Sequence, residues 1–172
     1  MMHLSKKTEF LNVEQVTEDM NTWINRSYIT EPLKEELQKA NVLILPQEGF
    51  RDYKEPVFPI GTEDIYIFFK EHSNERFSPE ICIEDKDYKE LALHSSLLIL
   101  GSFAVTVMVA PIFVDVISHY LEKKAGDKIE ECDVNIKVTV VEEDKSTCIH
   151  YQGRAADFSQ SFTSIVKSLE KE

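Results

Sequence analysis

The stretch Leu91–Val114, LALHSSLLILGSFAVTVMVAPIFV, contains no Asp, Glu, Lys or Arg. An uncharged and largely apolar run of about 18 residues or more is a candidate for a membrane-spanning helix. It is also too apolar to lie exposed on a soluble monomer. We therefore predict one very apolar long helix over about residues 91–123, and its environment decides what class of protein this is.

Two environments are open for this predicted helix. In the first, Leu97–Val114 spans or associates with a membrane. In the second, the helix is buried in protein, either within the fold of the chain or at an oligomer interface. Pro111 favours the second, because a proline inside the run breaks or kinks the helix and leaves neither half long enough to span alone. The side chains expected at the interface or in the membrane are Leu97, Leu98, Leu100, Phe103, Val107, Val109, Phe113 and Ile117.

Composition limits the choice further. The chain has 172 residues, with 19 Lys and Arg against 31 Asp and Glu, and a formal net charge of −12. Such a charge repels phosphate backbones, which argues against a nucleic-acid partner. The length fits a single domain. We expect a helical segment over residues 1–40 and one α/β domain over residues 41–172.

The first half of that domain has the order of an α/β layered fold. The short apolar run Asn41–Pro46, NVLILP, is typical of a strand buried on both faces. A helix beginning at Thr62 and a strand near Glu80–Ile83 follow, and DKDYKELALHSS is expected to restart a helix. In the N-terminal segment, apolar residues at helical spacing predict a helix from Asn12 through Trp23, and Thr30 with Pro32 opens another.

The second half differs, because apolar and polar residues alternate from Val134 to Val140. This pattern predicts a half-buried strand, paired in a hairpin with Ser146–Gln152 about a turn near Glu143. The register puts Ile149 opposite Val138. An amphipathic helix closes a hairpin–helix unit over residues 133–170. The fold class is α/β, becoming α+β at the C-terminus, with a small mixed sheet and flanking helices.

Cysteines and histidines give no sign of a disulfide or a metal. The hairpin register places Cys132 beyond the ladder and Cys148 opposite Thr139, too far apart to bond. The five histidines have no ligand spacing with one another or with cysteine. We therefore expect free thiols, no metal and no cofactor.

The loop Gln47–Gly61 is where a ligand is expected, because it follows a buried strand and precedes a helix. Its candidate binding residues are Glu48, Arg51 and Asp52. In an enzyme, Glu48 or Asp52 would act as a general base and Arg51 would bind an anion. The alternative is a surface loop held by ion pairs between Arg51 and carboxylates. No triad spacing is present, so no catalytic residue is assigned.

The C-terminal half resembles a known group of bacterial proteins. The elements are an apolar helix ending in basic residues (VDVISHYLEKK), a strand (DVNIKVTVVEE), a return strand closing in IHYQG, and a final helix (ADFSQSFTSIVKSLEK). Over roughly residues 91–170, this order resembles the effector-associated constant component family of defence and conflict systems. That resemblance implies a non-catalytic adaptor that couples a sensor or protease to an effector. No functional residue is carried over, because the likeness is one of element order.

These observations lead to three expectations of function. The first is a non-enzymatic adaptor or oligomerising component of a bacterial, antiviral defence system, which contacts a protein partner or a second copy through its apolar helix. The second is a membrane-associated effector that uses Leu97–Val114. The third is a small-molecule-binding or hydrolytic domain that uses the Glu48–Asp52 loop. A cytoplasmic location is expected for the first.

Overall fold

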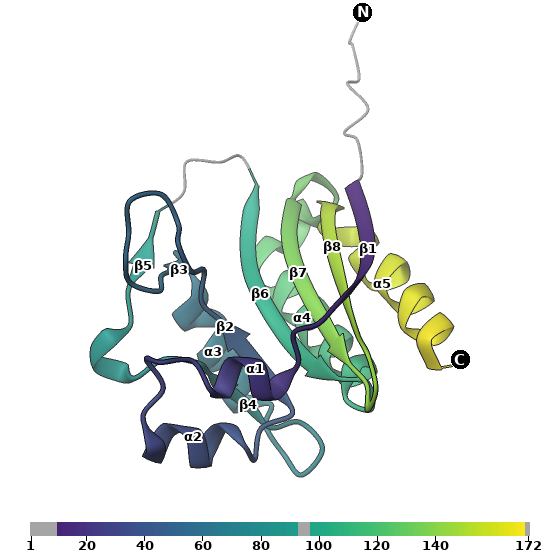
Figure 1. The fold of residues 1–172 in the computed structure, drawn as a ribbon. Coiled ribbons are helices and arrows are strands. Elements are labelled where there is room, and N and C mark those ends of the chain that lie inside the picture. The colour runs from purple at the N-terminus through teal and green to yellow at the C-terminus, as the bar shows by residue number, and fades with distance from the viewer. Residues whose placement is uncertain (1–9, 93–96, 171–172) are drawn as a thin grey trace, which may run out of the picture.

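The computed structural model describes residues 10–92 and 97–170. A six-stranded mixed sheet in the order β1-β8-β7-β6-β2-β4 forms the centre of the molecule, with helices on both sides (Figure 1). The strands are β1 (Phe10–Val16), β2 (Val42–Leu45), β4 (Pro79–Ile81), β6 (Leu98–Thr106), β7 (Asp133–Val141) and β8 (Ser146–Arg154), and β3 (Phe58–Pro59) pairs with β5 (Glu90–Leu91) apart from them. The helices are α1 (Met20–Ile24), α2 (Glu31–Leu37), α3 (Thr62–Glu71), α4 (Ala110–Ala125) and α5 (Ala155–Glu170), with short 3₁₀ turns η1 (Asp85–Asp87) and η2 (Gly126–Glu131).

The two faces of the sheet are covered differently. On one face, α3, α4 and α5 bury side chains such as Phe69, Phe113 and Phe158 against the sheet in one large apolar core. On the other, which we call the front face, α1 and α2 bury Ile24 and Leu37 against β2 and β6 in a smaller cluster. The α/β class with a mixed sheet and flanking helices is thereby confirmed.

The predicted long helix over 91–123 is wrong. Leu98–Thr106 is β6, which lies between β2 and β7 in the sheet, and its residues Phe103–Val105 are buried in succession where it pairs with the fully buried β2. A strand in this position needs no alternation of apolar and polar residues, so its sequence looks like that of a buried helix. The helix begins at Ala110, with Pro111 in its first turn, where a missing N–H costs nothing. Residues 93–96 lie outside the described residues.

The N-terminal segment also differs from the prediction. Residues Phe10–Val16 form β1, which pairs antiparallel with β8. The first helix is the short α1, Met20–Ile24, and it does not extend back to Asn12. The helix cap is Asp19, which forms a capping box with Thr22, and not Asn12. The segment DKDYKELALHSS contains η1 and β5 where a helix was expected. The helix cap at Thr30 is confirmed.

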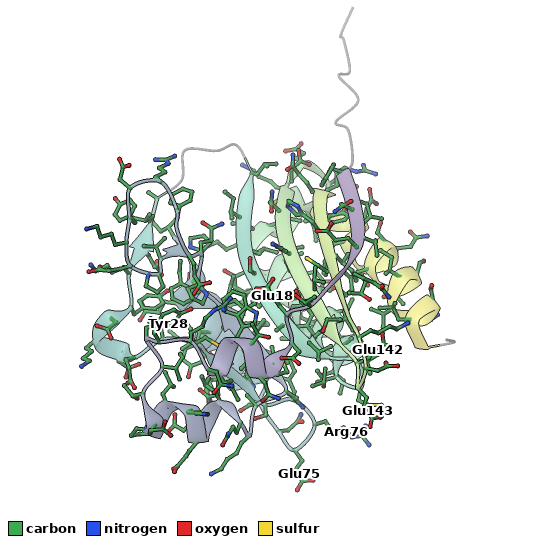
Figure 2. All side chains as sticks on the ribbon, viewed as in Figure 1. Glu18, Tyr28, Glu75, Arg76, Glu142 and Glu143 are labelled. Carbon is green, nitrogen blue, oxygen red and sulfur yellow. The ribbon has the colours of Figure 1, made fainter. Side chains whose placement is uncertain are left out.

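The C-terminal unit agrees with the prediction in detail. β7 and β8 pair with Thr139 opposite Cys148 and Val138 opposite Ile149, and α5 follows directly. Figure 2 shows Glu142 and Glu143 at the hairpin turn, at the lower end of the sheet. The three cysteines form no disulfide, and Cys82 and Cys148 are buried. The hairpin is the unit to which β1 adds on one side and β6 on the other.

Candidate ligand pocket on the front face

The front face changes from covered to open in the middle of the sheet. Over β2 and β6 it is closed by α1 and α2, whereas over β7 and β8 it presents the polar side chains of Asn135, Lys137, His150 and Gln152. These residues alternate with the core residues of the same strands, which places them all on the open side. A pocket lies at this step, between the end of the helical layer and the open sheet.

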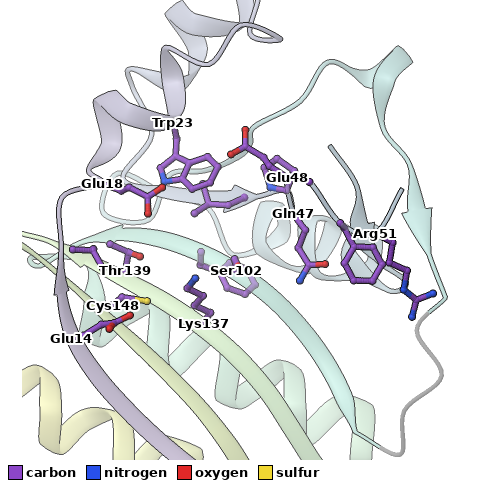
Figure 3. A pocket seen from close by; sticks show the side chains of 16 residues that line it. Glu14, Glu18, Trp23, Gln47, Glu48, Arg51, Ser102, Lys137, Thr139 and Cys148 are labelled. Atoms are coloured by element: carbon purple, nitrogen blue, oxygen red, sulfur yellow. The ribbon is translucent and has the colours of Figure 1, made fainter. Parts of the chain in front are cut away.

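The pocket has a volume of about 570 Å³, within the range of about 300–1,000 Å³ that small-molecule sites occupy. Figure 3 shows the indole of Trp23 on one side and Ser102, Lys137 and Thr139 of the sheet on the other. It is built by β1 with the turn that follows, α1, the end of β2 with the loop after it, and the strands β6, β7 and β8. The lining residues are Glu14, Val16, Glu18, Trp23, Leu45, Pro46, Gln47, Glu48, Gly49, Phe50, Arg51, Ser102, Phe103, Lys137, Thr139 and Cys148.

Arg26 contacts three residues that line the pocket: Trp23, Glu18 and Glu48. Its guanidinium carbon lies 4.5 Å from the centre of the Trp23 ring, a cation–π distance. Its Nη2 donates to Oε2 of Glu18 at 3.3 Å, and its buried Nε lies 3.2 Å from Oε2 of Glu48. One cation thus neutralises two of the three carboxylates that line the pocket.

Tyr28 makes the second contact to the loop carboxylate. Its hydroxyl donates a hydrogen bond to Oε2 of Glu48 at 2.9 Å. Burial, with the bond to Glu48, raises the pKa of Tyr28, so the phenol stays protonated as a donor. Glu48 is therefore occupied by two partners from the segment that follows α1.

The loop residues predicted to bind a ligand are not all brought together. Glu48 and Arg51 line the pocket, but Asp52 does not. Arg51 has a positive φ of 52°, and its guanidinium carbon lies 4.9 Å from the centre of the Phe50 ring. Within the described residues Arg51 forms no ion pair with a carboxylate, so the loop is not held in the way that the surface-loop alternative expected. Glu48 is held by Arg26 instead.

Lys137 is the cation on the sheet side of the pocket. It is exposed, and Figure 3 shows its side chain rising from β7 beside Ser102, its register partner on β6. Across the described ranges, no carboxylate lies within 4.0 Å of its amine. Its charge lowers the pKa of His150, although burial contributes more to that shift. Burial outweighs the Lys137 charge at Cys148, where the pKa is raised and the group remains a thiol.

A row of polar side chains continues from the pocket along the open face. Nε2 of His150 lies 3.1 Å from Oδ1 of Asn135, and Nδ2 of Asn135 donates to Oε1 of Gln152 at 3.1 Å. Because the Asn135 oxygen only accepts, Nε2 of His150 carries the proton. The Phe10 ring meets the His150 ring edge-on, with centroids 5.4 Å apart.

The side chains predicted to face a partner or a membrane are mostly inside the chain. Leu100, Phe103, Val109, Phe113 and Ile117 are buried in its own core, and Phe103 also lines the pocket. The remaining three, Leu97, Leu98 and Val107, are half-buried. In the described ranges, no helix has the length and apolarity that a bilayer crossing requires.

Trp23, Arg26 and Lys137 were missed as site residues by the sequence analysis. The alternation of β7 already places Lys137 on the polar side of its strand, but Trp23 was assigned to an apolar helical stripe.

Among the described residues, no group of three His, Cys, Asp or Glu side chains is arranged to hold a metal ion. Comparison with models of known families, with curated proteins and with solved structures gives no match.

Proposed function

We propose that this chain is a non-enzymatic binding domain that holds a small carboxylate-bearing ligand in the front-face pocket, between Lys137 and Trp23. The observation that carries the proposal is the amine of Lys137, which stands in the pocket without a carboxylate partner in the described chain. An ammonium group in such a site binds a carboxylate through charge-assisted hydrogen bonds.

The charge pattern around the pocket selects an anion over a cation. Glu18 and Glu48 are already paired with Arg26, which leaves Glu14 as the lining carboxylate without an ion pair in the described chain. Lys137 and Arg51, by contrast, are both available. With Arg26 counted, three cations balance the three lining carboxylates, so the pocket is less negative than a chain with a formal charge of −12 as a whole.

The apolar side chains that border the pocket indicate what the rest of the ligand is. Trp23 supplies the largest flat surface, and Leu45, Pro46 and Phe50 add further apolar area near it. Binding sites of this kind fix orientation with a few polar groups and gain affinity from apolar and aromatic walls. An aromatic carboxylate satisfies both requirements.

A hydrolytic role has less support from the same geometry. The Cys148 thiol has a raised pKa and is a poor nucleophile. Glu48 accepts from Tyr28 and is paired with Arg26, and Asp52 does not line the pocket. The proposal keeps the expectation of a non-enzymatic component but assigns its function to the pocket, because most of the apolar residues first assigned to a partner are in the core.

The experiment uses the fluorescence of Trp23, which is the single tryptophan of the chain. The protein is titrated with benzoate, with neutral benzamide and with cationic benzylamine. We expect a saturable change in emission with benzoate, weaker binding of benzamide and the weakest with benzylamine. Lys137→Met should reduce benzoate affinity about tenfold or more, the loss of one charge-assisted hydrogen bond.

Lys167→Met is the matched control, because it removes the same charge from an exposed position on α5. It should leave benzoate binding unchanged. Equal affinity for benzoate and benzamide in the wild-type protein, or a Lys137→Met variant that binds as the wild type does, would overturn the proposal.

A further inference from the structure

Strand β1 is an edge strand with little protection against further pairing. Among residues 10–92 and 97–170, no strand lies on its outer side. Natural edge strands are generally kept from pairing by proline, lysine, a bulge or a cover. Phe10–Val16, FLNVEQV, contains no Pro or Lys, and its register with β8 runs without interruption. Seven residues of regular strand are therefore open to a further strand.

Strand β1 exposes apolar side chains on both of its faces. Leu11 and Val13, on the core side, have 45% and 46% of their surface exposed, and Phe10, on the front face, has 48%. Leu11 and Val13 lie opposite Tyr151 and Ile149 of β8, which are both buried. The core side of the sheet thus continues to β1 but is only half covered there.

We propose that β1 pairs antiparallel with β1 of a second copy of this chain, so that two sheets join into one across a two-fold axis. A two-fold interface is self-complementary, with residue i facing j and j facing i. Each residue of β1 must therefore be compatible with the β1 residue that lies opposite it in the second copy. β1 meets this condition in one register.

Two residues that pair across neighbouring strands point to the same face of the sheet. Because side chains alternate between faces, a two-fold axis can pass only between the two copies of one residue, which then pairs with itself. Centring on Glu14 sets two carboxylates opposite each other, which destabilises the pair. Centring on Asn12 pairs only five residues and sets Glu14 opposite Phe10. Centring on Val13 pairs all seven residues, Phe10 with Val16, Leu11 with Gln15, and Asn12 with Glu14, and brings the two Val13 side chains together.

Each chain is acidic, but this register places no two carboxylates of β1 opposite each other. Glu14 is the one charged residue of Phe10–Val16, and its neighbour across the axis is the amide of Asn12, which donates to a carboxylate. The axis is perpendicular to the sheet, so both front-face pockets open on the same side of the dimer.

The first test is the mass of the full chain in solution, measured by size-exclusion chromatography with light scattering. We expect the mass of two 19.9 kDa chains. Val13→Lys sets two ammonium groups opposite each other at the axis and should give monomer. Ile67→Lys, at a similarly exposed apolar residue on α3, is the control and should remain dimeric. A monomeric wild type, or a Val13→Lys variant that is still a dimer, contradicts the proposal.

A cross-linking series tests the register without relying on a destabilising variant. In a Cys132→Ser background, Val13→Cys places two thiols face to face, where paired residues have the Cα separation of about 4.4–6.8 Å that a disulfide needs. Leu11→Cys lies opposite Gln15 and has no partner thiol. Mild oxidation should link the Val13→Cys protein into a covalent dimer and leave Leu11→Cys unlinked. Equal linking of both, or of neither, overturns the Val13-centred register.

Discussion

The carboxylate of Glu90 caps a helix that begins almost thirty residues earlier in the chain. Its Oε1 accepts a hydrogen bond from the backbone N–H of Gly61 at 3.1 Å, and its Oε2 accepts one from the N–H of Glu63 at 3.2 Å. Thr62 was the predicted cap, but its hydroxyl donates to the carbonyl of Pro59 at 2.7 Å. Gly61 is the N-cap residue, with a φ of 96°, and it has no side chain to serve this purpose. β5 therefore stabilises α3 from outside the helix.

Glu90→Gln should lower the free energy of unfolding by about 1 kcal/mol at neutral pH, as for the loss of a helix cap. Burial alone would raise the pKa of Glu90, but the hydrogen bonds from Tyr88, Gly61 and Glu63 outweigh it and lower the pKa. A lowered carboxyl pKa stabilises the fold above the ordinary value of 4.5, and this contribution is lost as the pH falls through the pKa of the folded state.

Urea denaturation at neutral pH and well below pH 4.5 measures both effects. The difference between wild type and Glu90→Gln should shrink at the lower pH. Glu71→Gln removes an exposed carboxylate at the other end of α3, where a negative charge opposes the helix dipole, and should not destabilise the fold. A Glu90→Gln variant as stable as Glu71→Gln would contradict the capping role.

The hairpin could be predicted from sequence because both of its strands carry local information. Residues 133–141 alternate with period two, and the short turn near Glu143 fixes which residues meet. Thr139 therefore faces Cys148 as expected. The closing helix has an apolar stripe of the same clarity.

β1 and β6 could not be assigned in this way. β6 has three successive buried residues, Phe103–Val105, so it lacks alternation there, and β1 lies at an edge where both faces are partly exposed to solvent. The partner of β1 is β8, far away in the sequence, and tertiary pairing of this kind overrides local spacing. The pocket shows the same limit. The loop residues Glu48 and Arg51 were predicted from their place after β2, whereas Trp23 and Lys137 line one pocket only because α1 packs over β2 and β6, next to β7 in the sheet.

Val109→Asp should unfold the chain and not merely dissociate an assembly. Val109 is 2% exposed, and a carboxylate in its place would be buried without a partner, at a cost of about 3 kcal/mol or more. The adjacent Met108 is 86% exposed, and Met108→Asp should change stability by about 0.5 kcal/mol or less. Thermal or urea unfolding of the two variants, followed by circular dichroism, gives the comparison. Similar small effects would show that Val109 is on the surface, as the predicted interface helix required.

His150 should make stability depend on pH in the mildly acidic range. Burial, and next the charge of Lys137, lower its pKa below the ordinary value of 6.5. The unfolded chain therefore binds a proton at a higher pH than the folded one, and the free energy of unfolding falls as the pH drops below about 6.5. His150→Gln keeps a donor for Asn135 but cannot titrate, so its stability should fall less over this range. His119→Gln, on the exposed side of α4, should follow the wild type. If the two variants have the same pH profile, the folded state does not favour neutral His150.

Arg26 should control anion binding although it does not line the pocket. Arg26→Gln leaves Glu18 and Glu48 without their cation, which makes the pocket more negative and should weaken benzoate binding several-fold. Arg26→Lys keeps the charge but loses the planar guanidinium that reaches both carboxylates over Trp23, so an intermediate affinity is expected. Arg76→Gln, in an exposed turn, removes the same charge at a distance and should bind as the wild type does. Trp23 emission without ligand provides a second measurement. Loss of the guanidinium exposes the indole, so the emission should shift to longer wavelength in both Arg26→Gln and Arg26→Lys and stay unchanged in Arg76→Gln.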